Sequence, residues 1–484
     1  SDYPRATEFE YITRIIEERG IGVIGHLNEP AILREPFKLS YVEDQKLVIE
    51  KHLRNRGYVN AEVTSEIIGV WRLKYNVDYE PLVSIIIPTK DQLPLLVACV
   101  TTILEKSSYH NYEILIVDNN SELNETKIWL DGIAQVDPER IRVISYPYPF
   151  NYSAMNNMAA REAKGEYLVL LNNDTAIIQN EWLNNMLNHA LRPEVGIVGA
   201  KLYYPNSCIQ HAGVVLGLRG PADHPFIGKN NDDRGYLYRL VADQNYTAVT
   251  AACLMVRKEV YDAVGGLDEE NFKVSYNDID FCLKVREAGY MTVWTPYAKV
   301  MHEGSVSQSK IDLTKQHEKI IRFQNEQDAM YKKWSPLIAN DPAYNSSLTK
   351  NGEGFELIEN STLTWQPVFW KPAPNVLAHM ADENGCGNYR IIKPFEAMQH
   401  SGLIQGTLSN LLLSYPQLMQ LETDSIVFQR EISPEFHEWI RRASKFLSVF
   451  KVYELDDYLP NVPIKNMHRA HMPKDILKSL RKSL

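Results

Sequence analysis

Three carboxylates follow short apolar segments, each at the point where the segment turns polar. Asp91 comes after "SIIIPTK", Asp118 after "EILIV" and Asp174 after "YLVLLNN". One carboxylate at a strand end is ordinary, but three that meet repel one another unless a cation or ligand lies between them. Mg²⁺ and Mn²⁺ take oxygen ligands, commonly one or two carboxylates together with phosphates. Asp174 and Asn172 are therefore candidate metal ligands, and His302 in "KVMHEGSVSQ" is a further one.

The elements that must position these residues alternate between strands and helices. Pro81 opens the uninterrupted apolar strand "LVSIIIPTKD", of the kind found in parallel sheets covered on both faces. A helix over 93–105, the strands "EILIV" and "IRVIS", a helix over 153–163, the strand "YLVLL", a helix over 181–189 and the strand "GIVGA" follow. This alternation predicts βαβ units and a mostly parallel sheet. Right-handed crossovers place the carboxyl ends of the strands at one edge, where α/β sheets bind ligands.

The length of 484 residues predicts two or three domains. Residues 1–80 read as a helical and extended lead-in, with a helix stopped by Gly57 and a hairpin over 61–77. We expect the main α/β domain over 81–334, with a helix starting near Asn277 and another over 308–334. Five prolines and "KNGEGFE" indicate a linker over 335–374, and strand-like segments then predict a partial second α/β domain over 375–484.

The composition excludes several classes of protein. A net charge of −10 and a pI near 5.8 argue against a nucleic-acid-binding surface. The five cysteines are scattered without a CxxC pair, which fits a reducing cytoplasm. No apolar run approaches the roughly 20 residues that span a bilayer, and the charged N-terminus is no signal peptide. We expect a cytoplasmic protein with no transmembrane segment, and its location stays open to peripheral contact with the inner face of the membrane.

Five segments together resemble the family 2 glycosyltransferases of the GT-A fold. They are "VSIIIPTKD", "ILIVDNNS", "NYSAMNNMAAREAKGEYLVLLNND", "GGLDEENFKVSYNDIDFCLKVREAGY" and "HEGSVS", within about residues 82 to 310. The segments are most similar to the bacterial rhamnosyltransferase-like group. The resemblance implies a Rossmann-like, mostly parallel sheet flanked by helices, a nucleotide-sugar donor, a glycan or glycoprotein acceptor, and Mn²⁺ or Mg²⁺ as cofactor.

The resemblance also implies roles for individual residues. Asp118 would accept the N3–H of uracil or thymine, which indicates a UDP- or dTDP-sugar. Asn172, Asn173 and Asp174 occupy the DXD position, with Asp174 on the metal, and His302 matches the family's late metal-binding histidine. The implied nucleotide-binding residues are Pro88, Thr89, Asp91, Asp118, Asn156, Arg161 and Asn173.

A catalytic base is implied at the start of the predicted helix near Asn277. The family has a Glu-Asp pair where this chain has Asn277-Asp278, so Asp278 matches the base and the departure concerns Asn277 alone. Asn and Asp are also preferred helix caps, and either residue is a candidate for that role. We expect Asp280 and Trp294 on the acceptor side.

Residues 375–484 contain "GCGNYRIIKPFEAMQHSG", "SIVFQRE" and "VYELDDYLP", which resemble the first half of a GT-B glycosyltransferase of the family 4 kind. A GT-B enzyme binds its nucleotide with a second half. We therefore expect this part to be truncated and catalytically silent.

The sequence thus predicts a metal-dependent, inverting, non-processive glycosyltransferase of bacterial surface polysaccharide or glycoconjugate synthesis. Non-processivity follows from the absence of a QxxRW motif and of a membrane helix. The alternative is a non-catalytic sugar-nucleotide or glycan-binding scaffold with a decayed site. Metal-dependent donor hydrolysis separates the two. A nucleotidylyltransferase is a weaker rival, because its glycine-rich, arginine-containing signature is missing near the first strand.

Overall fold

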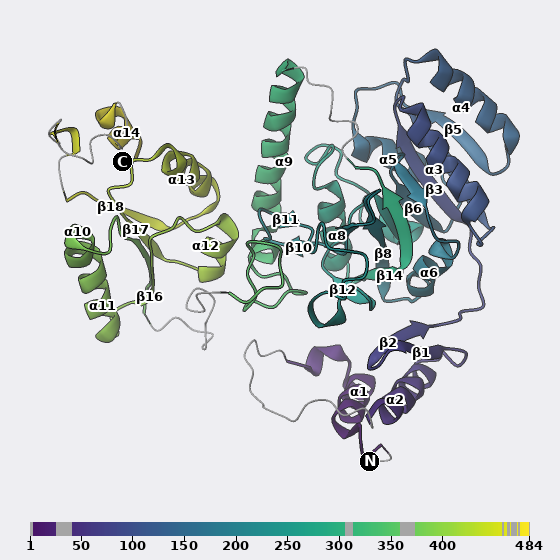
Figure 1. Cartoon of the computed structure of the whole chain (residues 1–484), viewed down its shortest axis with the longest axis horizontal. Helices are drawn as coiled ribbons and strands as arrows, with labels where there is room; N and C mark the ends of the chain where they lie inside the picture. The colour runs from purple at the N-terminus through teal and green to yellow at the C-terminus, as the bar shows by residue number, and fades with distance from the viewer. Residues whose placement is uncertain are drawn as a thin grey trace.

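The computed structural model describes residues 3–25, 41–304, 313–358, 373–456, 459–461, 465, 472 and 475–483. Figure 1 shows three successive parts of this chain: a small N-terminal part, a central domain built on a large sheet, and a C-terminal α/β part. The central domain carries the residues predicted to do chemistry.

The N-terminal part is a helix pair and a hairpin. It contains α1 (Thr7–Arg19), the short 3-10 turn η1 (Ile21–Val23), α2 (Val42–Asn55), β1 (Glu62–Ile67) and β2 (Val70–Lys74), and the two strands pair antiparallel. The predicted helix and hairpin are confirmed. The hairpin docks on the central domain, because Asn188 accepts a hydrogen bond from the Tyr75 amide and donates to the Leu73 carbonyl.

The central sheet has ten strands. Its main path runs β12 (Gln244–Tyr246), β14 (Met291–His302), β8 (Val195–Tyr203), β13 (Cys253–Arg257), β6 (Tyr167–Leu171), β3 (Val83–Thr89), β4 (Tyr112–Asp118) and β5 (Ile141–Ser145). Two short strands lie off this path, with β7 (Thr175–Ile177) paired to β14 and β9 (Ile209–His211) paired to β8. Along the main path only β12 and β13 run against the others. This confirms the predicted α/β class with a mostly parallel sheet.

Helices cover both faces of the sheet (Figure 1). One face packs α3 (Leu93–Lys106), α4 (Asn124–Val136) and α6 (Trp182–Ala190) onto residues such as Ile85 and Ile87. The other packs α5 (Tyr152–Glu162), α7 (Lys258–Ala263), α8 (Asn277–Glu287) and α9 (Leu313–Ala339) onto residues such as Ile86 and Leu170. The sequence reading missed α4. Gly132 lies in that helix and Ile128 is 64% exposed, so its apolar residues do not mark one face.

Between β9 and β12 the chain forms short elements over the polar end of the sheet. These are β10 (Val215–Leu216), β11 (Ala222–Asp223) and the turn η3 (Tyr236–Tyr238). Gly213 has a φ of +94° and a Cβ there would lie 2.4 Å from the Tyr246 ring, so only glycine fits at this approach.

The C-terminal part is a separate four-stranded parallel sheet. Its order is β16 (Gln405–Ser409), β15 (Asn375–His379), β17 (Ser425–Gln429) and β18 (Phe450–Glu454). Its helical segments are α10 (Gly385–Gly387), η6 (Asn388–Ile392), α11 (Lys393–His400), α12 (Tyr415–Leu421), α13 (Pro434–Phe446), η7 (Leu459–Asn461) and α14 (Ile476–Ser483). The structure thus has a second, smaller α/β unit, while its assignment as half of a GT-B fold stays a prediction.

Helix α9 joins the central and C-terminal parts. The Tyr331 ring lies 4.5 Å from that of Tyr415, and Asp328 forms ion pairs with Arg442 and Lys445. None of the helices in the described ranges is both long and apolar enough to cross a membrane.

The predicted linker over 335–374 differs from the structure where it is described. Residues up to Ala339 end α9, and Asp341, Tyr344 and Phe355 are buried against the central domain. The Asp341 carboxylate accepts hydrogen bonds from the Leu216 amide and the Thr247 hydroxyl. Residues 359–372 lie outside the described part of the chain.

Candidate functional site

The carboxyl ends of β3, β4 and β6 meet at one edge of the sheet. Thr89 and Asp118, the last residues of β3 and β4, are register partners. Asn173, in the turn that follows β6, donates from Nδ2 to Thr89 Oγ1 over 2.9 Å. The strand ends that carried the sequence prediction therefore lie together.

On one side of this edge, two loops are tied into a single wall. The Asp91 carboxylate accepts hydrogen bonds from the Glu122 and Leu123 amides, each at 3.0 Å from Oδ1. Asp118 Oδ1 accepts from the Ser121 amide at 3.1 Å, and Ser121 Oγ accepts from the Asp91 amide at 2.9 Å. Asp91 and Asp118 thus fix the geometry of the two loops, mainly through their Oδ1 atoms. Asp118 Oδ2 has a longer contact, 3.4 Å from the Ser121 amide.

On the other side, three predicted metal ligands converge. His302 Nε2 lies 3.0 Å from Asp174 Oδ1 and 3.3 Å from Asn172 Nδ2. The His302 and Asp174 side chains are only 13% and 11% exposed. The sheet brings them together, since His302 on β14 is the register partner of Thr175 on β7.

Gln210 sets the orientation of the His302 ring. Its Nε2 donates to the His302 carbonyl at 3.3 Å, so its Oε1 faces His302 Nδ1 at 2.5 Å. An acceptor at Nδ1 keeps the proton on that nitrogen and leaves the Nε2 lone pair facing Asp174. That is the tautomer that ligates a metal through Nε2.

The donor set suits a divalent cation held with the help of a ligand. One carboxylate, one imidazole and one amide meet here, and the described residues contain no group of three or more His, Cys, Asp or Glu side chains arranged for a metal. Such a set leaves coordination positions for phosphate oxygens, which is how Mg²⁺ sites at substrate phosphates are commonly built. The residues present therefore fit Mn²⁺ or Mg²⁺ bound together with a diphosphate.

Asp278 lies in the first turn of α8 and faces the same region. Its Oδ2 accepts a hydrogen bond from the Ala251 amide at 3.1 Å, and its Oδ1 accepts from the Ile279 amide at 2.9 Å. The carbonyl of Ala251 in turn accepts from the Tyr152 hydroxyl at 3.2 Å. The carboxylate is half-buried and held by two amides.

Tyr152 connects the two carboxylates electrostatically. Burial raises the pKa of its hydroxyl, and the charges of Asp278 and Asp174 raise it further, against a hydrogen bond from Asn156 that lowers it. Both carboxylates are therefore near enough to act on one phenol. The backbone links the same groups, because the Asn172 amide donates to the Ala252 carbonyl at 3.1 Å and the Ala251 amide donates to Asp278.

The sequence reading missed a histidine pair beside this space. His211 Nδ1 lies 2.7 Å from His224 Nδ1, so one ring donates to the other. Burial lowers the pKa of His224, while Asp223 and Asp278 act in the opposite direction. The signal in the sequence was two histidines in the apolar stretch "IQHAGVVLGLRGPADH".

Two expectations about the acceptor side are wrong. Trp294 is fully buried with its ring edge against Tyr246, so its side chain is out of reach of a substrate. Asp280 is also fully buried, where it accepts a hydrogen bond from Trp334 Nε1 at 2.7 Å and pairs with Lys333 Nζ at 2.6 Å. It anchors α8 to α9.

The structure also places the two helix residues that were predicted to approach the nucleotide away from the candidate nucleotide site. Asn156 is fully buried and donates to the Tyr152 carbonyl within α5. Arg161 is exposed in the last turn of α5, next to Glu162, whose carbonyl binds Arg142 at the start of β5. The start of β5 lies at the edge of the sheet opposite Asp118, so Arg161 is at the wrong end.

Neither Asn277 nor Asp278 occupies the N-cap position of α8. Tyr276 occupies the N-cap position of α8, with a φ of 60° and no capping side chain. Asn277 is buried and donates to the Val274 carbonyl. Asp278 lies inside the first turn, where its Oδ1 accepts from the free Ile279 amide and its Oδ2 accepts from the Ala251 amide.

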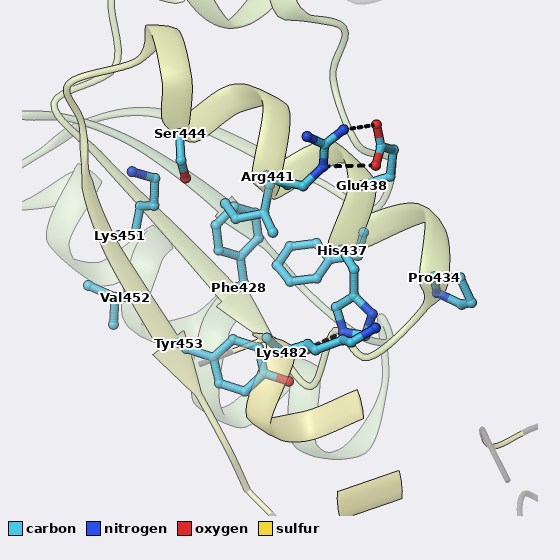
Figure 2. A pocket seen from close by; sticks show the side chains of 13 residues that line it. Phe428, Pro434, His437, Glu438, Arg441, Ser444, Lys451, Val452, Tyr453 and Lys482 are labelled. Atoms are coloured by element: carbon cyan, nitrogen blue, oxygen red, sulfur yellow. Dashed lines mark hydrogen bonds and ion pairs between the residues drawn. The ribbon is translucent and has the colours of Figure 1, made fainter. Parts of the chain in front are cut away.

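The C-terminal part has a cavity of its own, of about 690 Å³, between α13, β18 and α14 (Figure 2). In Figure 2 Arg441 forms two hydrogen bonds with Glu438 beside it, and His437 points toward the end of α14. None of the predicted site residues lines it.

Comparison with known proteins bears on the same central domain. Residues 84–265 match the family model described as "Glycosyl transferase family 2". The chain is 45% identical over 316 residues to "Uncharacterized protein y4gI" of Sinorhizobium fredii, which covers 65% of this chain and 34% of that protein. It is 36% identical over 341 residues to "O-antigen biosynthesis protein RfbC" of Myxococcus xanthus, covering 67% and 26% respectively.

A more distant relative is the "N-acetylglucosaminyl-diphospho-decaprenol L-rhamnosyltransferase" of Mycobacterium tuberculosis, 24% identical over 210 residues, 39% of this chain and 66% of that protein. The chain spans about a third or less of the length of the first two relatives. The matched region contains β3, β4 and β6, whose ends carry Asp91, Asp118 and Asp174. The family 2 model thus matches the part of this chain that carries the strand ends of the candidate site, over residues 84–265.

Proposed function

We propose that the central domain transfers a sugar, with inversion, from a UDP- or dTDP-sugar to a hydroxyl of a glycan or protein acceptor. The observation that carries the proposal is the contact of Asp174 with His302, together with the tie of Asn172 and Asp278 to the adjacent residues Ala252 and Ala251. The family 2 match supports the same reaction class.

The wall formed by the loops after β3 and β4 would hold the nucleoside. Pro88 and Thr89 are buried at its base, and Asp91 and Asn173 fix its two ends through the hydrogen bonds to Glu122 and Thr89. Asp118 would accept the N3–H of a uracil or thymine ring with its less occupied Oδ2. Cytosine has no N3–H, so this contact discriminates against CDP.

Asp174, His302 and Asn172 would hold Mn²⁺ or Mg²⁺. A divalent cation bound with the diphosphate would neutralise the charge that develops on the leaving group. Gln210 keeps His302 in the tautomer that presents its Nε2 lone pair.

Asp278 would act as the base. The acceptor oxygen attacks the anomeric carbon, the bond from that carbon to the diphosphate oxygen breaks, and the acceptor proton passes to the Asp278 carboxylate. The amides of Ala251 and Ile279 hold this carboxylate in place, and both are neutral hydrogen-bond donors. A positioned base of this kind typically contributes about 10²–10⁴-fold to the rate.

The names of two relatives indicate the kind of pathway in which those relatives act. One name is O-antigen biosynthesis, and the other describes rhamnosyl transfer to a lipid-linked sugar. We propose that this chain likewise acts in bacterial surface polysaccharide or glycoconjugate synthesis. Its cytoplasmic location, with peripheral contact at the membrane as the alternative, stays a prediction.

A thermal-shift screen tests the proposal. The protein is heated with UDP, dTDP, CDP and GDP and with their sugars, each with and without Mn²⁺. A ligand that binds only the folded state raises the melting temperature, so UDP or dTDP compounds should do so in Mn²⁺ and CDP and GDP should not. Equal shifts with all four nucleotides would remove the role of Asp118. Donor binding without any turnover of the donor would favour the scaffold alternative.

A further inference from the structure

A second polar cavity lies where the N-terminal hairpin docks on the central domain. Its volume is about 310 Å³. Its walls come from the β1–β2 hairpin, the ends of β8 and β7, the bulged middle of β14, and the loop before β12. The side chains that matter for its chemistry are Arg72, Lys201, Tyr203, Tyr297 and Lys299.

Lys201 is an unusual residue for this position. Its side chain is 3% exposed, and its ammonium group donates one hydrogen bond, to the Leu240 carbonyl at 3.1 Å. The ammonium also lies 5.3 Å from the centre of the Tyr203 ring, but it has three donors and a single hydrogen-bond acceptor. Burial, together with the nearby charge of Lys299, lowers the pKa of Lys201 to about 8, although the charge of Asp233 acts in the opposite direction.

Arg72 and Lys299 add two further positive charges to the same cavity. The Arg72 guanidinium lies 4.1 Å over the Tyr297 ring and donates to Asn185 Oδ1 at 3.0 Å, which fixes its position. Within the described residues, neither Arg72, Lys201 nor Lys299 has a carboxylate within the 4.0 Å of an ion pair. Glu66, the acidic residue of the lining, is exposed.

The cavity is also lined by a tyrosine whose hydroxyl has no hydrogen-bond partner among the described residues. Tyr203 is 5% exposed, and among the residues described here its buried hydroxyl has no hydrogen-bond partner. Lys201 and the Tyr203 hydroxyl are buried, while Arg72 and Lys299 are half-buried beside them. An unpaired buried hydroxyl and a buried ammonium next to like charges are costly unless a ligand compensates for them. Three cations and a free hydroxyl are compensated by an anion with several oxygens and more than one negative charge.

We infer that this cavity binds a phosphate or diphosphate group. The space far exceeds the roughly 30 Å³ that one water occupies in the liquid, so it accommodates a polyatomic anion. Arginine and lysine together match phosphate oxygens in number of donors and in charge. A single carboxylate would leave two of the three cations unpaired.

The cavity is distinct from the proposed donor site. Lys299 and His302 both lie on β14, three residues apart, which is about 10 Å along a strand. Lys299 is held there by the hydrogen bond from its amide to Gln179 Oε1. An anion in this cavity therefore does not need the metal ligands Asp174 and His302, and its source is either a free phosphate compound or the diphosphate of a lipid-linked sugar.

Calorimetric titration of the full chain with sodium pyrophosphate in EDTA tests the inference. The wild type should bind, and Lys299→Gln should weaken binding at least tenfold, because it removes one of three cations. Lys201→Met is a second variant that removes another of the three cations. If this substitution impairs folding, Lys299→Gln alone decides the test. Lys127→Gln, at an exposed position on α4, is the matched control and should bind as the wild type does.

No binding in EDTA, or equal affinity in Lys299→Gln and wild type, would overturn the inference. The result is separable from the proposed function: Asp174→Ala should keep pyrophosphate binding in EDTA, and Lys299→Gln should keep Mn²⁺-dependent donor binding. Competition with farnesyl diphosphate then identifies the source. Tighter binding than pyrophosphate assigns the cavity to a lipid-linked diphosphate, and equal binding assigns it to a free phosphate compound.

Discussion

The His302 imidazole lies 3.0 Å from the Asp174 carboxylate because two strands far apart in the chain pair next to both residues. His302 is the register partner of Thr175, and the Glu303 amide donates to the Asp174 carbonyl at 2.9 Å. Backbone hydrogen bonds on either side therefore set this distance before any ligand binds. A preformed site of this kind requires little rearrangement to take up a cation.

Gln210 should control metal affinity without touching the metal. Gln210→Leu removes the acceptor at His302 Nδ1, and loss of such a supporting hydrogen bond typically costs about 10–100-fold in affinity. Gln210→Glu keeps an acceptor at that place and should retain most of the affinity. Calorimetric titration of Mn²⁺ in the presence of the nucleoside diphosphate measures both variants. Equal affinity in Gln210→Leu and wild type would show that Gln210 does not control metal affinity through His302.

Asp278→Asn should separate catalysis from binding. Asparagine keeps an oxygen for one of the two amides that hold the carboxylate, and loss of the other acceptor costs roughly 1–3 kcal/mol, so the variant should still fold and bind the donor. Transfer should fall by about a hundredfold or more, because the acceptor proton has lost its base. Transfer rates, donor affinity and melting temperature are measured together. Transfer within a few-fold of the wild type would exclude Asp278 as the base, and the buried Asp280 offers no replacement.

Glu326 on α9 should position Asp278 from a distance. It is 3% exposed, and its two oxygens accept hydrogen bonds from the Val274 and Ser275 amides, just before α8. Glu326→Gln leaves one of these amides without its acceptor, which costs roughly 1–3 kcal/mol of stability. We expect kcat to fall while KM for the donor stays unchanged. Glu318→Gln, at an exposed position of the same helix, is the control and should change neither. A parallel rise in KM would mean that the variant disturbs the donor site instead.

His379 should make the C-terminal unit sensitive to acid. Burial lowers the pKa of His379 to about 4, against 6.5 for the free side chain, and its ring stacks on Phe428. The unfolded chain therefore binds more protons between these values, and stability should fall by about 3 kcal/mol as the pH drops from 6.5 to 4. His379→Phe should flatten that part of the profile, which chemical denaturation at several pH values measures. An unchanged slope would mean that other groups cause it.

Strand positions and strand ends followed from the sequence. Uninterrupted apolar runs identified β3, β4 and β6, and the polarity change after each run located Asp118 and Asp174 at the same edge. The pairing of β14 with β7 was not predictable, because no local pattern records which distant strands meet. Residue type alone made His302 a candidate ligand, and the resemblance, not spacing, then matched it to a metal-binding histidine.

Side-chain direction was the other limit. Asp278 and Asp280 are two residues apart on one helix, about 200° around its axis, so one faces the site and the other the core. Trp294 was expected on the acceptor side, but it lies in an apolar strand, and the sheet buries its side chain. His211 and His224 lie among short strands and turns, where no periodicity exists to place them.

The most direct test of the central claim is the Mn²⁺ dependence of donor binding and turnover in wild type and Asp174→Ala. Titration with UDP- and dTDP-sugars, followed by assay of released nucleoside diphosphate, compares these proteins with Asp131→Ala, a control at an exposed position on α4. We predict that Mn²⁺ strengthens binding and supports release in the wild type and in Asp131→Ala, and that Asp174→Ala loses both by at least tenfold. Unchanged Mn²⁺-dependent binding and release in Asp174→Ala would contradict the assignment of this edge as the donor site.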